Sequence, residues 1–318
     1  MRIHQQADKL RRIWGAFRAP RVLMTANEFR VFDHLVAPAT ASVVAKRLKT
    51  DVRATTILLD ALTGLGLVSK RGKTYRNASL ADTLLVSGRP FYQGDIISHA
   101  ANLWDNWSGL NEVLRTGKPF RCAHDHEAFI LGMHNIAVLK AKQVVDAIGL
   151  KGIKTAIDIG GGPGTYAIEM AQRGVSATVY DAPETIRIAR KVARKSGAGR
   201  VFFQKGDFLH DPVKGTFDLA LISQVLHAYP PEENLALIRK ARGILNPGGR
   251  IAVQEFFIEP NLARPHYNAL FSVNMLVNTE GGRCYAIPEI KQWLKATGFR
   301  SIRVKKLGDS VMLVGEGA

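Results

Sequence analysis

An acidic residue followed by several glycines marks segment 155–166, TAIDIGGGPGTY. Asp158, Gly160, Gly162 and Gly164 are spaced D-x-G-x-G-x-G at the end of an apolar run. Residues without side chains let a ligand lie against the backbone, and the helix that follows offers free N–H groups. A dinucleotide fingerprint, G-x-G-x-x-G, would place the third glycine one residue later. The loop is consistent with S-adenosylmethionine or a dinucleotide, and a tight strand–helix turn without a ligand is the plain alternative.

Two carboxylates strengthen the case for a ligand that contains a nucleoside. Asp181 ends the next strand-like stretch, 21 positions after Gly160, where a carboxylate can accept from both ribose hydroxyls. Asp207 ends the third stretch, where it can accept from the adenine amino group with Phe208 against the ring. Either aspartate alone could merely cap a helix. Ser223, at the end of the fourth stretch, completes the candidate cofactor site.

A histidine after the fourth stretch offers a proton acceptor. His227 lies in SQVLHAYPPEE, at the sheet edge where doubly wound folds bind ligands. If the ligand is S-adenosylmethionine, the reaction is methyl transfer from a sulfonium, an in-line displacement that requires the acceptor atom to be held opposite the sulfur. When that acceptor is a hydroxyl, a base that titrates near neutral pH can take its proton. We predict that His227 is this base; the alternative is a histidine on a helix surface or cap.

The elements that would hold these residues alternate in the second half of the chain. Strand-like TAIDI, SATVYD, VFFQKGD, FDLALIS and RIAVQEFF are separated by helix-like stretches. This alternation predicts a parallel sheet covered on both faces. The first half predicts helices, including one over 25–36 with four apolar residues at helical spacing, then two capped helices and a hairpin over 68–76. We therefore expect an α/β fold, with a doubly wound Rossmann-like domain after a helical winged-helix domain.

Composition limits the class of protein. The 318 residues are 46% hydrophobic and 22% charged, which is typical of a globular protein with a large core. Lys and Arg number 44 against 27 Asp and Glu, giving a net charge of +17 that is spread along the chain. Such spreading favours a solvated basic surface over a nucleic-acid groove. Cys122 and Cys284 form no disulfide framework and no zinc pattern, so we expect a reducing, cytoplasmic location. We expect no membrane span and no secretory signal.

Several segments together resemble a known family. AIDIGGGPG, YDAPETI, GDF, LISQVLHAYPPEE, LNPGGRIAVQE and NMLVNTEGGRCY occur in the order seen in the plant caffeic acid and animal hydroxyindole O-methyltransferases. Bacterial polyketide-tailoring enzymes and the bacteriochlorophyll C-20 methyltransferase belong to the same family. The N-terminal ANEFRVFDHL and LWDNWSGLNEVLRTGKPF also resemble it, so the resemblance covers nearly the whole chain.

The resemblance implies a fold, a cofactor and an assembly. The cofactor would be S-adenosyl-L-methionine, with S-adenosyl-L-homocysteine as product, and His227 matches the histidine of the family's L-H-D-W motif. A homodimer would form through a winged-helix dimerisation domain over 1–95. A helical connector over 96–150 would roof the substrate pocket, and the methyltransferase domain would span 151–318. This role for the winged helix requires no specific nucleic acid.

Two departures from the family pattern bear on the proposed base. Ala228 stands where the family has an aspartate, and Cys284 where it has a glutamate. A neutral thiol cannot stabilise an imidazolium as a carboxylate does. Another carboxylate, Glu280 or Glu255, could compensate, or the acceptor hydroxyl could be acidic enough to need little help. Otherwise the acceptor is a carbon, or the protein resembles the non-methylating aclacinomycin hydroxylase branch.

Contacts to the acceptor come partly from the same resemblance. The family packs methionines about an aromatic acceptor, and asparagines could bond its oxygens; the candidate substrate residues are Met133, Asn274, Met275, Asn278 and Cys284. The methionines could equally belong to the core. Three histidines lie in the helical segment expected to roof the pocket, His99, His126 and His134. No cluster has metal-ligand spacing, so no metal is expected.

The sequence leaves two classes of function. The first is methyl transfer to a hydroxyl of a medium-sized aromatic or polyketide-like molecule, with transfer to carbon of a tetrapyrrole or quinone-like acceptor as a variant. The second is a winged-helix DNA-binding regulator whose methyltransferase-like half senses a ligand. The helix that a DNA reader would insert, near 51–63, carries Asp51 and Asp60, which suit a phosphate-facing surface poorly.

Overall fold

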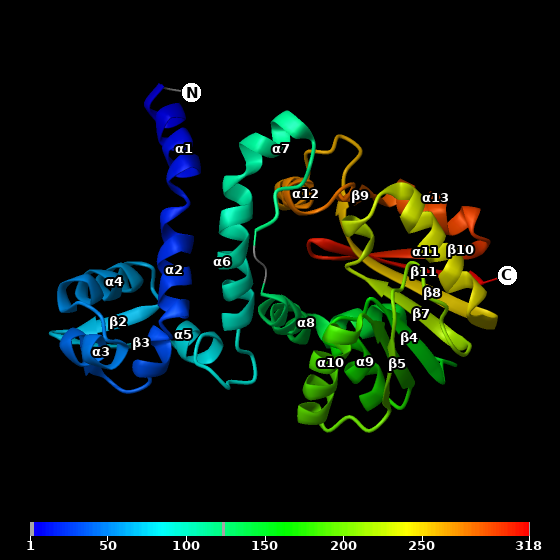
Figure 1. The fold of residues 1–318 in the computed structure, drawn as a ribbon, viewed down its shortest axis with the longest axis horizontal. Helices are drawn as coiled ribbons and strands as arrows, with labels where there is room; N and C mark the ends of the chain where they lie inside the picture. The colour runs from blue at the N-terminus through cyan, green and yellow to red at the C-terminus, as the bar shows by residue number, and fades with distance from the viewer. Residues whose placement is uncertain (1–2, 123–124, 318) are drawn as a thin grey trace. The chain divides into compact units, whose positions relative to one another are not determined.

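The computed structural model describes residues 3–122 and 125–317 and divides into two units between Leu103 and Trp104. That division falls inside α6 (Gly94–Ser108). Figure 1 shows the helices of the first unit and the large sheet of the second. Among the described residues, no helix combines the length and apolarity needed to cross a membrane.

The first unit contains the winged-helix arrangement expected from the sequence. Its helices are α1 (Ile3–Gly15), α2 (Arg18–Glu28), η1 (Val31–His34), α3 (Ala41–Leu48), α4 (Val52–Gly64) and α5 (Ser79–Leu84). Its strands, β1 (Ala39–Thr40), β2 (Val68–Arg71) and β3 (Thr74–Asn77), form an antiparallel sheet in the order β1-β3-β2. Thr40 caps α3 and Asp51 caps α4 through their side-chain oxygens.

The helix expected over 25–36 is interrupted, so this prediction was wrong. α2 ends at Glu28, and Arg30 has a left-handed φ of 52° before the short η1. The backbone carbonyls of Phe32 and Leu35 accept from the side chain and backbone N–H of Asn77 instead of continuing a helix. Helical spacing had correctly indicated the burial of Val31, Phe32 and Leu35, but Phe29 is 42% exposed and the helix is not continuous.

The second unit is a doubly wound α/β domain, as predicted. Its helices are α7 (Leu110–Thr116), α8 (His126–Ile148), α9 (Thr165–Gln172), α10 (Pro183–Ser196), η2 (Leu226–Ala228), α11 (Pro231–Gly243), α12 (His266–Asn278) and α13 (Ile287–Ala296). Its strands are β4 (Thr155–Ile159), β5 (Ser176–Asp181), β6 (Val201–Lys205), β7 (Phe217–Ser223), β8 (Leu245–Ile258), β9 (Tyr285–Ala286), β10 (Phe299–Leu307) and β11 (Ser310–Gly317).

Strand order determines where this domain can bind a ligand. The sheet runs β10-β11-β8-β7-β4-β5-β6, with β9 beside β8. β4 pairs in parallel with both β5 and β7, while β11 and β10 join antiparallel. The chain therefore moves outward from β4 to β6 and then returns to the other side of β4. A doubly wound sheet binds its ligand at the carboxyl ends of the strands at such a reversal.

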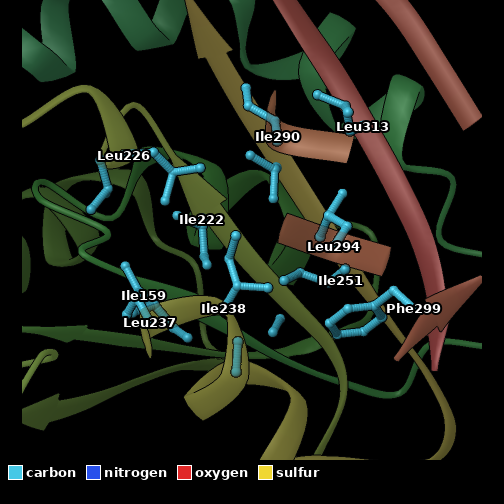
Figure 2. Packing of buried hydrophobic residues seen from close by; sticks show 14 of the residues in the cluster. Ile159, Ile222, Leu226, Leu237, Ile238, Ile251, Ile290, Leu294, Phe299 and Leu313 are labelled. Atoms are coloured by element: carbon cyan, nitrogen blue, oxygen red, sulfur yellow. The ribbon is translucent and has the colours of Figure 1, made fainter. Parts of the chain in front are cut away.

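Two apolar clusters cover the two faces of this sheet. Side chains of α8, α9 and α10 pack on one face, and side chains of α11 and α13 pack on the other. Figure 2 shows part of the second cluster, where Leu237 and Ile238 of α11 and Ile290 and Leu294 of α13 surround strand residues. Burial on both faces explains the nearly continuous apolar sequence of the central strands β4 and β7, since neither of their faces meets water.

Candidate functional site

The glycine loop joins β4 to α9 at the reversal point. Gly160, Gly162 and Gly164 have φ values of 66°, 53° and 75°, a region that favours glycine. A Cβ on Gly160 would lie 2.8 Å from Val225 Cγ2, so the protein itself also requires a small residue there. A Cβ on Gly162 would meet no atom within 4 Å among the described residues. The side of the loop at Gly162 is therefore open.

Asp158 is buried beneath this loop without a partner. Asp158 is 1% exposed, and neither of its carboxylate oxygens has a hydrogen bond to any residue in 3–122 or 125–317. An added Cβ on Gly161 would lie 2.8 Å from the Asp158 Cγ, which places the carboxyl directly under the loop. Burial, and secondarily the charge of Asp181, raises the pKa of Asp158 to about 8.

Asp181 ends β5 and faces the same loop. One carboxylate oxygen accepts from the Gly162 N–H at 2.8 Å, and the other from the Ala182 N–H at 2.7 Å. Burial raises the pKa of Asp181, and these donors partly oppose the shift. The predicted neighbours Gly162 and Asp181 are thus in direct contact.

Asp207 and Phe208 follow β6 by a short turn. The Asp207 carboxylate is exposed and accepts from the Leu209 N–H at 2.8 Å. The Phe208 ring lies near the glycine loop, because a Cβ on Gly160 would be 3.4 Å from its Cε1. Phe208 also packs edge-on against Tyr229 with 5.9 Å between ring centroids. The structure therefore brings this pair to the edge that carries the glycine loop.

Ser223 ends β7, but its hydroxyl turns into the sheet. It donates to Gln254 Oε1 at 2.5 Å, and Ser223 is 9% exposed. The next residue, Gln224, has a left-handed φ of 58°, which is uncommon outside glycine. This turn leads the chain into η2, which carries His227.

His227 is paired with a buried carboxylate. Its Nδ1 lies 2.7 Å from Glu255 Oε1 on β8, and the His227 backbone N–H donates to Glu255 Oε2 at 3.2 Å. The side chain of Glu255 is fully buried and that of His227 is 12% exposed. The Phe256 N–H also donates to Glu255 Oε1 at 2.8 Å, so the carboxylate is fixed from several sides. Of the two carboxylates considered as replacements, Glu255 contacts His227, whereas Glu280 is exposed.

The loop at 279–283 fixes the backbone beside His227. A Cβ on Gly282 would lie 2.3 Å from the His227 carbonyl oxygen and 3.0 Å from the Ala228 carbonyl carbon. Only a residue without a side chain permits this approach. The Gly281-Gly282 pair therefore has a packing role that its sequence context did not reveal.

Aromatic side chains around His227 were missed by the sequence analysis. The Phe271 ring meets the imidazole edge-on at 4.9 Å, and the Phe256 ring lies 6.0 Å from it. Tyr267, 54% exposed, packs against Phe256 at 6.2 Å. Two features of the sequence could have indicated this surface. They are the Phe-Phe dipeptide directly after Glu255 and the four-residue spacing of Tyr267 and Phe271 on α12. This apolar, aromatic surface lies next to the candidate base.

Two of the predicted acceptor residues bind other side chains. Asn274 Oδ1 accepts from Trp107 Nε1 at 2.9 Å, and Asn278 Oδ1 accepts from Asn106 Nδ2 at 2.6 Å. Asn278 Nδ2 also donates to the Asn274 carbonyl oxygen at 2.7 Å. These bonds fasten α12 to the end of α6.

The remaining predicted acceptor residues differ in exposure. Met275 is 7% exposed and Cys284 is 1% exposed, whereas Met133 on α8 is partly exposed. Burial raises the pKa of the Cys284 thiol to about 11, with the nearby Glu255 charge adding to the shift. Cys284 therefore stays neutral next to Glu255 near pH 7.

Two of the three histidines expected near the pocket contact the helices that follow the cofactor strands. His134 Nδ1 lies 2.8 Å from Thr165 Oγ1 at the start of α9, and His126 Nε2 lies 3.2 Å from Thr185 Oγ1 on α10. Within the part of the chain that the structure describes, no group of three His, Cys, Asp or Glu side chains could hold a metal ion.

Comparison with known proteins agrees with this geometry. The sequence model of the O-methyltransferase domain matches residues 104–300, and that of the O-methyltransferase dimerisation domain matches residues 12–87. The chain belongs to the O-methyltransferase family. The predicted resemblance is therefore confirmed, and this O-methyltransferase depends on S-adenosylmethionine like the family as a whole.

Individual relatives cover almost the full O-methyltransferase chain. This chain is 31% identical over 299 residues to a 3-hydroxy-5-methyl-1-naphthoate 3-O-methyltransferase of Streptomyces sahachiroi. The match covers 89% of this chain and 86% of the relative. Acetylserotonin O-methyltransferase of Gallus gallus is 28% identical over 321 residues and is covered to 92%, as is this chain. The structure of human N-acetylserotonin methyltransferase with S-adenosylmethionine has a TM-score of 0.89 at 25% identity, covering 99% of this chain and 98% of that one.

The residues at the reversal point fit S-adenosylmethionine. The ligand carries positive charge at its sulfonium and amino groups, and the unpartnered Asp158 offers a carboxyl beneath the loop. The open side of Gly162 leaves the backbone accessible, and Asp181 beside it can accept from hydroxyls. The dependence on S-adenosylmethionine thus agrees with the buried carboxyl groups and the accessible glycine backbone at this edge of the sheet.

We expect Asp158 to make stability depend on pH. Folding raises its pKa from 3.8 to about 8. Between about pH 4 and pH 8 the native protein therefore still holds a proton that the unfolded chain has already lost. Asp158 therefore lowers stability progressively as the pH rises through that window. Asp158→Asn should differ least from wild type near pH 4 and should unfold at an increasingly higher temperature than wild type toward pH 8. Thermal unfolding of the cofactor-free protein at several pH values measures this difference.

Asp105→Asn serves as a control for this experiment, since Asp105 is exposed. Its difference from wild type should not change with pH. A difference between Asp158→Asn and wild type that stays constant from pH 5 to pH 8 would contradict the raised pKa.

Proposed function

We propose that this O-methyltransferase transfers a methyl group to a hydroxyl of a medium-sized aromatic or polyketide-like molecule, with His227 as general base. The observation that carries the proposal is the 2.7 Å contact between His227 Nδ1 and the buried Glu255, at the edge that also holds the glycine loop. The printed names of two relatives, a naphthoate 3-O-methyltransferase and an acetylserotonin O-methyltransferase, support an aromatic acceptor.

The cofactor would lie along the strand ends of β4, β5 and β6. S-adenosylmethionine, when bound, supplies a methyl group on a positively charged sulfur. We assign Asp158, Gly160 and Gly162 to its methionine and sulfonium end, and Asp181 to its ribose hydroxyls. Asp207 and Phe208 would receive the adenine. Ser223 would support the cofactor site indirectly, because its hydroxyl donates to Gln254 on β8 and does not face the ligand.

His227 is prepared for proton transfer by its partner. An ionised Glu255 can only accept, so Nδ1 carries the hydrogen and Nε2 keeps its lone pair. The acceptor oxygen would bond to the methyl carbon as the bond from that carbon to the sulfur breaks, leaving S-adenosylhomocysteine, and the hydroxyl proton would pass to His227 Nε2. The Glu255 carboxylate then stabilises the imidazolium. Cys284, neutral because burial raises its pKa to about 11, adds no second negative charge.

The acceptor ring would lie against the aromatic surface beside the base. Phe256 and Phe271 flank His227, and their faces suit a flat aromatic molecule. Met133, Met275 and Cys284 remain candidate contacts. Asn274 and Asn278 would act mainly by holding α12 in place, because their side-chain oxygens already accept from Trp107 and Asn106.

We further propose a cytoplasmic homodimer that forms through the N-terminal unit and binds no specific nucleic acid. α1 exposes Leu10, Ile13 and Trp14 by 62%, 66% and 55%, and apolar side chains gathered on one helix suit a protein partner. The acids on the helix that a DNA reader would insert are engaged: Asp51 caps α4, and Asp60 pairs with Lys70 at 2.6 Å.

Replacement of the base should abolish turnover selectively. His227→Ala should lower kcat by roughly 10²–10⁴-fold because the acceptor proton has no nearby base. Glu255→Gln should lower kcat by roughly tenfold or more, since the amide cannot stabilise an imidazolium. Calorimetric titration with S-adenosylhomocysteine should give nearly unchanged affinity for both variants. His4→Ala, an exposed histidine on α1, is the matched control, and unchanged turnover in His227→Ala would reject the base role.

The acceptor class can be tested with methyl-labelled cofactor. Phenols, quinones and tetrapyrroles are incubated with the enzyme, and products are separated and analysed by NMR. We expect label on phenolic substrates, as a methoxy group. Label attached to ring carbon, or found only on the tetrapyrrole, would contradict oxygen transfer to an aromatic hydroxyl.

The assembly can be measured by size-exclusion chromatography with light scattering. We expect twice the 34.9 kDa chain mass at micromolar concentration. Replacing Ile13 and Trp14 together by serine should shift the mass toward that of one chain, because the exposed apolar side chains are lost. A single-chain mass for the wild-type protein would reject the homodimer.

A further inference from the structure

The turn that carries His227 is held by a buried amide on the helix that follows it. Asn234, near the start of α11, is completely buried. Its Nδ2 donates to the Leu226 carbonyl oxygen at 2.9 Å and to the Tyr229 carbonyl oxygen at 3.0 Å. A carboxamide nitrogen carries two hydrogens, so one side chain can serve both carbonyls. Asn234 therefore spans the turn from the residue before His227 to the second residue after it.

A second side chain holds the same turn from a different element. The Tyr285 hydroxyl on β9 donates to the Tyr229 carbonyl oxygen at 2.5 Å. Tyr285 also pairs with Phe257 on β8, the strand that supplies Glu255. The turn is thus tied to α11 by Asn234 and to the strand of Glu255 by way of β9.

The two carbonyls do not need the amide to be hydrogen-bonded. The Leu226 carbonyl also accepts from the Tyr229 N–H at 3.2 Å, and the Tyr229 carbonyl accepts from Tyr285. A fully buried amide costs free energy that its hydrogen bonds must offset, and a leucine of similar size would avoid that cost. The specific contribution of Asn234 is to join the two carbonyls through one side chain, which fixes the shape of the turn.

The imidazole of His227 depends on that shape. The His227 backbone N–H and its Nδ1 contact different oxygens of the buried Glu255 carboxylate, so both contacts require one placement of the backbone. Gly282 lies against the His227 carbonyl, where even a Cβ would approach the oxygen to 2.3 Å. A displacement of about 1 Å in a catalytic group can cost roughly 100-fold in rate. Small changes of the turn should therefore be visible in turnover.

We propose that Asn234 is a positioning residue for methyl transfer, fixing the turn so that His227 Nδ1 stays on Glu255 and Nε2 faces the acceptor hydroxyl. This inference rests on the proposed role of His227 as base. Because Asn234 is completely buried, it acts only through the turn. Its effect should accordingly appear in the transfer step and not in the affinity for the cofactor.

The test uses the full chain with methyl-labelled S-adenosylmethionine and a hydroxynaphthoate as acceptor. Asn234→Leu keeps the approximate size of the side chain and removes both donated hydrogens. Asn246→Leu is the matched control, because Asn246 lies at the start of β8, far along the strand from Glu255, and its amide donates to Asp218. Asn234→Leu is also made in the His227→Ala background.

We expect Asn234→Leu to lower kcat roughly 10- to 100-fold. The KM for S-adenosylmethionine and the calorimetric affinity for S-adenosylhomocysteine should stay nearly unchanged. Asn246→Leu should keep the wild-type kcat. In the His227→Ala background, Asn234→Leu should cause no further loss, because a positioning residue has no effect once the group that it positions is absent.

Proton NMR of the cofactor-free protein gives a measurement that needs no acceptor. The His227 Nδ1–H held by the Glu255 carboxylate should give a low-field resonance that is missing in His227→Ala. We expect this resonance to be lost or moved in Asn234→Leu and kept in Asn246→Leu. If the hydroxynaphthoate is not methylated, this measurement decides the question.

The outcomes separate this inference from the base role itself. Wild-type kcat or an unchanged resonance in Asn234→Leu, with turnover lost in His227→Ala, would overturn the positioning role alone. So would an undiminished further loss in the His227→Ala background, or a loss of cofactor affinity as large as the loss of kcat. Wild-type turnover in His227→Ala, or no resonance that depends on His227, would instead reject the base. If thermal unfolding shows that Asn234→Leu is poorly folded, Asn234→Ala replaces it with the same expected and contradicting results.

Discussion

The parallel pairing of β4 with both β5 and β7 is the constraint on which the site depends. Because parallel strands end at the same edge, the residues that follow them meet there although they are far apart in the sequence. The glycine loop after β4 meets Asp181 at the end of β5, and the turn after β7 carries His227. β8 adds Glu255 from the next position in the sheet. Without this strand order, these groups would not share one edge.

Buried acids at this edge are stabilised in different ways. Glu255 accepts from two backbone N–H groups and lies next to His227. Asp181 accepts from two backbone N–H groups, those of Gly162 and Ala182. Asp158 has no such donor among the described residues, which is costly in a cofactor-free protein. A buried carboxyl group without hydrogen-bond donors, beside others that have them, is expected where a ligand supplies the missing partner.

Local sequence patterns predicted much of this arrangement because they report local physics. The strand-like stretches became β4 to β8, and Thr40 and Asp51 cap helices as expected. The helical spacing gave a wrong prediction at 25–36. There Asn77, distant in sequence, donates to backbone carbonyls that would otherwise accept within a helix. Such a contact with a distant strand leaves no trace in the helical period of the segment itself.

The sequence alone determined the family and the cofactor class and led to the proposal of His227 as the base, because all three depend on motifs contiguous in the chain. It left open which carboxylate would replace the acid missing at Cys284. Only the tertiary structure decided this, since Glu255 reaches His227 across neighbouring elements 28 residues apart in sequence. The aromatic ring of Phe271 beside the base and the contact between His126 and Thr185 likewise exist only after folding. Contacts between distant segments depend on the strand order, which no local period encodes.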